Sequence, residues 1–129
     1  MTMTEELKRV LYVEDEPDIQ KVAKLALETV GNLEVLICSS GAEAIEKAAP
    51  YEPDLLLLDV MMPGMDGPAT LAALRAIDSL TDVPAVFLTA KVMPSEMQEF
   101  KEMGAIDVIA KPFDPMTLAE QVRAAWEKR

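Results

Sequence analysis

Histidine is absent from the sequence, and cysteine occurs once, at Cys38. Without histidine the chain holds neither a Ser-His-Asp nor a Cys-His catalytic set, and the usual zinc ligand sets are missing too. A single cysteine forms no disulfide within the chain. Positive charge is also scarce, because 12 Lys and Arg residues stand against 23 Asp and Glu residues, which gives a net charge of −11. These absences exclude the commonest hydrolase and zinc chemistry and favour an acidic protein of a reducing compartment.

Long hydrophobic runs are missing as well. No run approaches the roughly 20 apolar residues that span a bilayer, and the polar start at 1–9 lacks the apolar core of a secretory signal. The negative charge repels nucleic-acid phosphates and anionic lipids. We therefore expect a cytoplasmic protein, a monomer or weak dimer, that contacts neither nucleic acid nor membrane.

What the chain does contain is a regular alternation of two patterns over 129 residues, 50% of them hydrophobic. Short apolar runs, typical of strands buried on both faces, occur at 10–13, 33–38, 55–58, 84–88 and 106–110. Helical spacing follows each run, over 17–30, over 40–48, after the loop at 61–67, over 94–103 and from Asp114, the expected N-cap of the last helix. We predict an α/β fold: one doubly wound five-stranded parallel sheet with helices on both faces.

Polar side chains follow four of the predicted strands at the point where each strand ends. They are Glu14 and Asp15, Asp59, Thr89 and Lys111. A polar residue at any single strand end needs no functional reason. The combination of acids, hydroxyl and ammonium makes chemical sense as a unit, because the carboxyl ends of parallel strands meet at the sheet edge where such folds bind ligands.

This set of side chains favours phosphoryl chemistry. Three carboxylates in one cleft repel each other, which favours either a raised pKa or a bound cation. A few hard oxygen ligands suit Mg²⁺, and Lys111 and Thr89 are suited to phosphoryl oxygens. Asp59 ends the most apolar strand, and a carboxylate there can act as nucleophile and form an aspartyl phosphate.

Four motifs at these positions resemble the receiver domain of two-component response regulators, in particular the single-domain chemotaxis type. The motifs are VEDE at 13–16, LLLLDVMMPGMDG at 55–67, VFLTA at 86–90 and KPF at 111–113. The resemblance spans essentially the whole chain. It implies a flavodoxin-like sheet with strand order 2-1-3-4-5, and one receiver domain over residues 1–129 without an output domain.

Carried over residue by residue, the resemblance implies that Asp59 accepts a phosphoryl group from a histidine kinase or a histidine phosphotransfer protein. The implied cofactor is Mg²⁺, and its implied ligands are Glu14, Asp15, Asp59 and the backbone carbonyl of Met61. The residues that would contact the phosphoryl group are Thr89, Lys111 and the small Ala90, which leaves access open.

Two further positions are implied to tune the response. Lys91, like Met61, stands where the family varies its autodephosphorylation rate. Val108 stands three residues before Lys111, where family members commonly carry a Tyr or Phe ring that turns inward on activation. A valine has no such ring, so we expect output through the face of helix four, strand five and helix five by backbone shifts after Thr89. The Lys111–Pro112 bond resembles the family's cis peptide.

Three functions stay open for a signalling protein that we expect not to be an enzyme. The first is a regulator that contacts an unknown downstream protein when phosphorylated. The second is a phosphoryl relay or sink that drains a kinase. The third is an interaction module that works without phosphorylation. A Mg²⁺-dependent hydrolase is a further alternative, but the sequence offers no clear additional general acid or base.

Overall fold

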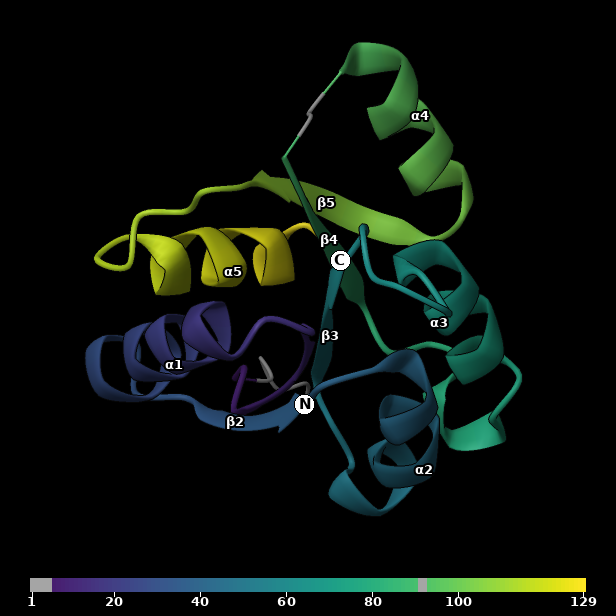
Figure 1. Ribbon diagram of the computed structural model, residues 1–129, viewed down its shortest axis with the longest axis horizontal. Helices are drawn as coiled ribbons and strands as arrows, with labels where there is room; N and C mark the ends of the chain where they lie inside the picture. The colour runs from purple at the N-terminus through teal and green to yellow at the C-terminus, as the bar shows by residue number, and fades with distance from the viewer. Residues whose placement is uncertain (1–5, 91–92) are drawn as a thin grey trace, which may run out of the picture.

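A computed structural model describes residues 6–90 and 93–129 of the chain (Figure 1). Five strands form one sheet in the order β2-β1-β3-β4-β5, and every neighbouring pair is parallel. The strands are β1 (Arg9–Val13), β2 (Glu34–Cys38), β3 (Leu55–Asp59), β4 (Ala85–Thr89) and β5 (Ala105–Ala110). The predicted fold class and strand order are confirmed.

Helices cover both faces of this sheet. They are α1 (Pro17–Leu25), continued by the π-helical turn η1 (Ala26–Val30), α2 (Gly41–Tyr51), α3 (Gly67–Arg75), the 3-10 turn η2 (Asp78–Leu80), α4 (Pro94–Glu102) and α5 (Leu118–Glu127). In Figure 1, α1 and α5 lie on one side of the sheet, and α2 and α3 lie on the other. No helix in the described part of the chain is long and apolar enough to cross a membrane.

The central strands are continuous apolar runs in the sequence because each face of the sheet packs against its own hydrophobic core. Alternate side chains of β1 and β3 enter opposite cores. Tyr12 and Leu57 pack towards α1 and α5, whereas Leu58 packs towards α2, α3 and α4. All three side chains are fully buried. A strand buried on both sides has no polar face, so the first polar residue comes where the strand leaves the sheet.

Two predicted helix ends differ from the structure. Asp114 is not the N-cap of α5, because its carboxylate accepts a hydrogen bond from the Met116 backbone N–H within a separate turn, and Thr117 occupies the cap position. Helix α2 runs past the predicted end at 48, because Pro50 is accommodated within the helix and Glu52 closes it in a left-handed conformation with φ of 56°.

Gly67, the first residue of α3, allows the loop after β3 to close tightly on the carboxyl end of that strand. A Cβ atom at this position would lie 2.6 Å from the Asp59 backbone oxygen and 2.9 Å from the Val60 Cα atom. The Gly67 N–H also donates to the Val60 carbonyl at 3.0 Å. Because both obstructing atoms belong to the backbone, a side chain here forces the main chain of Asp59 to move.

We expect Gly67→Ala to lower the free energy of unfolding by about 2 kcal/mol, the usual scale for overpacking a tight site. Urea denaturation checks this. Gly41→Ala is the comparison, because a Cβ there meets the side chains of Thr70 and Met65 rather than backbone. An unfolding free energy for Gly67→Ala equal to that of the unsubstituted protein would contradict the prediction.

Candidate functional site

Three carboxylates meet at the carboxyl ends of β1 and β3. Val13 and Leu58 are register partners in the sheet, so the next residues, Glu14 and Asp59, emerge side by side. One carboxylate oxygen from each of Glu14, Asp15 and Asp59 lies within 4.8 Å of the others. Glu14 is 0% exposed and Asp59 is 3% exposed. The structure therefore brings together the three acids that the sequence singled out.

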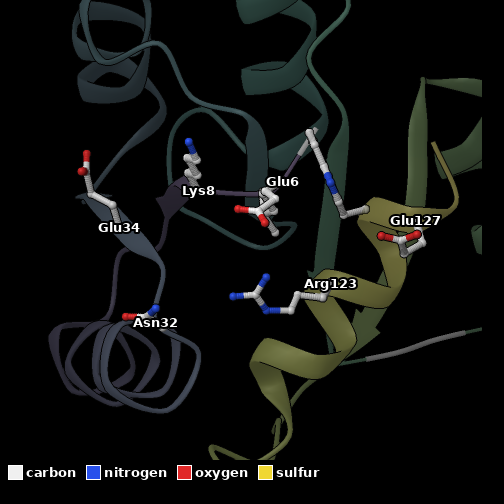
Figure 2. A pocket seen from close by; sticks show the side chains of 8 residues that line it. Glu6, Lys8, Asn32, Glu34, Arg123 and Glu127 are labelled. Carbon is white, nitrogen blue, oxygen red and sulfur yellow. The ribbon is translucent and has the colours of Figure 1, made fainter. Parts of the chain in front are cut away.

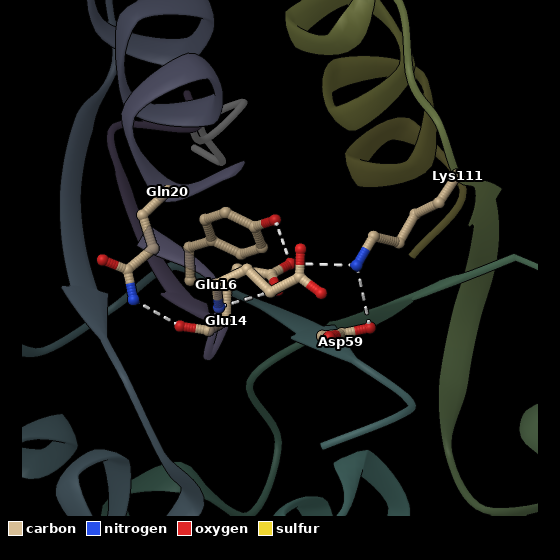
Figure 3. A network of polar contacts seen from close by, with 6 residues as sticks. Glu14, Glu16, Gln20, Asp59 and Lys111 are labelled. Carbon is tan, nitrogen blue, oxygen red and sulfur yellow. Dashed lines mark hydrogen bonds and ion pairs between the residues drawn. The ribbon is translucent and has the colours of Figure 1, made fainter. Parts of the chain in front are cut away.

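The Lys111 ammonium bridges two of these acids. Its Nζ lies 3.1 Å from Glu14 Oε1 and 3.2 Å from Asp59 Oδ1, as the dashed lines in Figure 3 show. Lys111 follows β5, which is the edge strand, and its side chain reaches back over the sheet to the acids. The Lys111–Pro112 peptide bond is cis, as the resemblance implied.

Thr89 lies in the same row of strand ends. It is the last residue of β4 and is 5% exposed. Its backbone carbonyl accepts a hydrogen bond from the Lys111 N–H at 2.8 Å, and its register partner is Ala110. The hydroxyl-bearing residue and the ammonium-bearing residue are thus fixed next to each other by sheet hydrogen bonds.

The surroundings of Asp59 and Lys111 shift the pKa values of both side chains. Burial raises the pKa of Asp59 to about 6, and the charge of Glu14 adds to this while Lys111 opposes it. Burial by itself would lower the pKa of Lys111, but its hydrogen bond to Glu14 and the charges of Asp59 and Glu14 outweigh burial and raise it. The lysine therefore stays charged, and one positive charge faces three acids.

The donor set fits a small hard cation. Carboxylate oxygens are ligands that Mg²⁺ prefers, and Mg²⁺ is commonly held by one or two carboxylates together with water and phosphate oxygens. Two of the three acids are buried and share a single lysine, so their negative charge is only partly compensated. Among the described residues, this acidic cluster is a group that could hold a metal ion.

The remaining predicted site residues lie at the rim or under the surface. Met61 is 75% exposed and Ala90 is also exposed. Val108 is 9% exposed and pairs in register with Phe87 of β4. The Phe87 ring packs on Phe100 of α4, with centroids 5.0 Å apart and ring planes tilted by 56°. Lys91 lies outside the described residues.

Two contacts at the site were missed in the sequence. The Tyr12 hydroxyl donates to Glu14 Oε1 at 2.9 Å, and the Gln20 side-chain amide donates to the Glu14 backbone carbonyl. Figure 3 shows the bond from Gln20 to Glu14, and Gln20 also donates to Ser39 Oγ at 3.1 Å. Tyr12 belongs to the apolar run 10–13, but residues two apart in a strand point to the same side. That spacing is the signal that would have linked Tyr12 to Glu14.

A pocket of about 580 Å³ lies at the other end of the strands, beside the amino ends of β1 and β2 (Figure 2). Charges of both signs line it, from Glu6, Glu34 and Glu127 and from Lys8 and Arg123. The acidic cluster lies at the carboxyl ends of the strands and lines no part of this pocket. Because the negative charges are concentrated at the carboxyl ends of the strands, we take that end of the sheet as the candidate site.

Comparison with known proteins shows the family of the chain. The family model described as the response regulator receiver domain matches residues 10–123. The chain belongs to this family. The receiver matches the chemotaxis response regulator CheY4 of Vibrio cholerae with a TM-score of 0.85 and 32% identity, over 93% of this chain and 99% of that one. It also matches the receiver domain of a histidine kinase from Syntrophus aciditrophicus, with a TM-score of 0.77 and 32% identity, over 93% and 90%.

Curated relatives of the receiver include transcriptional regulators. The DNA-binding response regulator MtrA of Mycolicibacterium smegmatis is 38% identical over 117 residues, which are 91% of this chain and 50% of MtrA. The transcriptional regulatory protein PrrA of Mycobacterium tuberculosis is 36% identical over 121 residues, 94% of this chain and 51% of PrrA. The chain thus spans about half the length of these relatives.

We expect Asp59→Asn to stabilise the metal-free receiver at neutral pH. The pKa of Asp59 in the folded protein lies above its usual value, so between about pH 4 and pH 6 the folded state binds more protons than the unfolded state. The contribution of Asp59 to stability therefore declines as pH rises through this window. Removing the charge should raise the free energy of unfolding by about 3 kcal/mol at pH 7 and by little at pH 4.

Urea denaturation in EDTA, carried out at several pH values on both proteins, measures this difference. A variant that is less stable than the unsubstituted receiver at pH 7, or a difference that does not change with pH, would contradict the prediction.

Proposed function

We propose that this receiver accepts a phosphoryl group on Asp59 from the phosphohistidine of a histidine kinase or phosphotransfer protein. The observation that carries the proposal is the contact of the Lys111 ammonium with the buried Asp59 carboxylate, 3.2 Å away, beside two further acids. The family is a signalling module whose members accept phosphoryl groups from histidine kinases.

In the proposed step, a carboxylate oxygen of Asp59 attacks the phosphorus atom. A P–O bond to Asp59 forms and the P–N bond to the donor imidazole breaks, and the imidazole leaves with the electron pair and takes up a proton. Phosphoryl transfer of this kind depends mainly on positioning and on stabilising negative charge. Lys111 is the group proposed to provide both, because its ammonium already contacts the attacking residue.

The remaining residues act around that step. Mg²⁺, when bound, would neutralise the acids and the incoming phosphoryl oxygens. Its proposed ligands are Glu14, Asp15, Asp59 and the Met61 backbone carbonyl. The Thr89 hydroxyl and Lys111 would hold phosphoryl oxygens, and the small side chain of Ala90 would leave the approach open.

A protein donor also needs a surface next to the site. An apolar groove of about 240 Å³ lies beside Lys111, lined by Ile19, Val22, Pro112 and Phe113. It combines one side of α1 with the segment that follows β5. We propose this groove as a surface that the protein donor contacts.

Incubation with Mg²⁺ and a small acyl phosphate should add the mass of one phosphoryl group to the receiver, because Asp59 is its proposed acceptor. Intact mass spectrometry detects the addition. Asp59→Asn should remain unmodified. Asp66→Asn is the matched control, because Asp66 lies in the same loop and caps α3, and asparagine caps helices equally well. Modification of Asp59→Asn would contradict the proposal.

The decay of that added mass separates a regulator from a second candidate, a phosphoryl relay or sink. Val108 favours the second candidate, because a valine lacks the ring that commonly couples phosphorylation to output in the family. A long-lived phosphoprotein supports the regulator, and rapid loss supports the sink. The third possibility, an interaction module independent of phosphorylation, requires that Asp59→Asn leave cellular output unchanged.

Output through the face of α4, β5 and α5 makes a further prediction. Phosphorylation should change amide NMR chemical shifts over residues 90–110, because Thr89 ends β4 and Phe87 of the same strand packs on Phe100 of α4. Heteronuclear spectra with and without the acyl phosphate measure this, and Asp59→Asn is the control. Identical shifts over this segment would remove the proposed output face.

A further inference from the structure

Tyr12 is unusual for a residue in the middle of a buried strand. It belongs to β1, between aliphatic neighbours, and is 0% exposed. Its ring packs in the core formed with α1 and α5. Its hydroxyl donates a hydrogen bond to Glu14 Oε1 at 2.9 Å. The side chain therefore connects the hydrophobic core directly to the acidic cluster.

The two oxygens of the Glu14 carboxylate accept different hydrogen bonds. Oε1 accepts hydrogen bonds from Tyr12 and from Lys111, at 2.9 Å and 3.1 Å. Oε2 accepts only a long bond, 3.3 Å, from the Glu16 backbone N–H among the bonds described. Two donors on one oxygen fix the plane and the rotamer of the carboxylate, and the other oxygen stays the better ligand for a cation.

Lys111 is a shared donor, whereas Tyr12 is not. The Lys111 ammonium also contacts Asp59, the residue proposed to be phosphorylated. In the proposed step Lys111 also holds phosphoryl oxygens, which would weaken its contact with Glu14. Among the contacts of the described residues, the Tyr12 hydroxyl bonds to Glu14 and to no other acid, and its ring is held by core packing. Of the two donors to Glu14 Oε1, Tyr12 is therefore the one without a described contact to Asp59.

We propose that Tyr12 is a positioning residue, which orients the Glu14 carboxylate for the divalent cation through the hydroxyl–carboxylate hydrogen bond. The inference rests on the proposed Mg²⁺ site. It also accounts for the pairing of a long acid with a tyrosine: the extra methylene of glutamate leaves its carboxylate more rotational freedom than aspartate has. The buried hydroxyl removes that freedom. Hydrogen bonds to ligand carboxylates have this role in metal sites generally.

The test compares two substitutions that each delete one hydroxyl group. Tyr12→Phe keeps the ring in the core and removes the bond to Glu14. Tyr51→Phe is the matched control, because Tyr51 ends α2 and its ring lies 6.0 Å from the guanidinium of Arg9, at the amino end of β1 and away from the acids. Titration calorimetry with MgCl2 measures the affinity of each protein, and thermal unfolding in EDTA measures folding.

We expect Tyr12→Phe to weaken Mg²⁺ binding by about tenfold, the lower range for partners of metal ligands. Tyr51→Phe should bind Mg²⁺ as the unsubstituted receiver does. Both variants should unfold cooperatively in EDTA. Equal affinity for Tyr12→Phe and Tyr51→Phe would overturn the inference while leaving the proposed function intact. Absence of Mg²⁺ binding by the unsubstituted receiver would overturn the proposed function and this inference together.

A second variant tests whether Tyr12 acts through Glu14. Glu14→Asp shortens the acid by one methylene and withdraws the carboxylate from the tyrosine hydroxyl. We expect it to weaken Mg²⁺ binding, and we expect the additional effect of Tyr12→Phe in this background to fall to less than about twofold. A full tenfold additional loss in the Glu14→Asp background would show that the tyrosine acts by another route, and the inference would be wrong.

Discussion

The site depends on the repulsion among three carboxylates that are held too close together. Glu14, Asp15 and Asp59 offer oxygens within 4.8 Å of one another, and two of these acids are almost inaccessible to water. A single lysine compensates part of the charge, and burial, with the charge of Glu14 adding to it, raises the pKa of Asp59. An arrangement with unbalanced charge favours any process that brings in positive charge or neutralises an acid. Binding of a divalent cation is such a process, and the same repulsion makes the acid costly for folding stability.

The parallel sheet makes this arrangement possible at small cost to the rest of the chain. Because both faces of every central strand are buried, polar groups collect at the strand ends, and parallel direction brings those ends to one edge. Backbone hydrogen bonds fix the spacing: the Lys111 N–H bonds to the Thr89 carbonyl, and the Gly67 N–H bonds to the Val60 carbonyl. The functional side chains are therefore placed by the scaffold, and only their final orientation is left to local contacts such as that of Tyr12 with Glu14.

The residues between the candidate site and the proposed output face differ from those common in the family. At the position where an aromatic ring is common in the family, β5 carries Val108, which is packed against Phe87 of the neighbouring strand. The aromatic pair of Phe87 and Phe100 instead connects β4 with α4. Since β4 also ends in Thr89, the proposed output would depend on packing of this strand against α4 rather than on rotation of an exposed ring. The proposed regulator and the proposed sink would differ in how long a displacement of this strand lasts.

The sequence by itself determined the fold class, the number of strands and the polar residues at the strand ends. Apolar runs that end in Glu14, Asp59 and Thr89 are a local signal, because a buried strand tolerates no polar group until it leaves the sheet. The motif resemblance supplied the strand order, which local patterns leave open. Helix ends were less well predicted, since Asp114 bonds within a turn of its own instead of capping α5.

Only the tertiary structure decided that Lys111 bridges Glu14 and Asp59, that a Cβ on Gly67 would collide with the Asp59 backbone, and that Tyr12 supports Glu14. These contacts depend on ångström-scale distances between segments far apart in the chain or on opposite sides of a loop. Composition and periodicity carry no such distances.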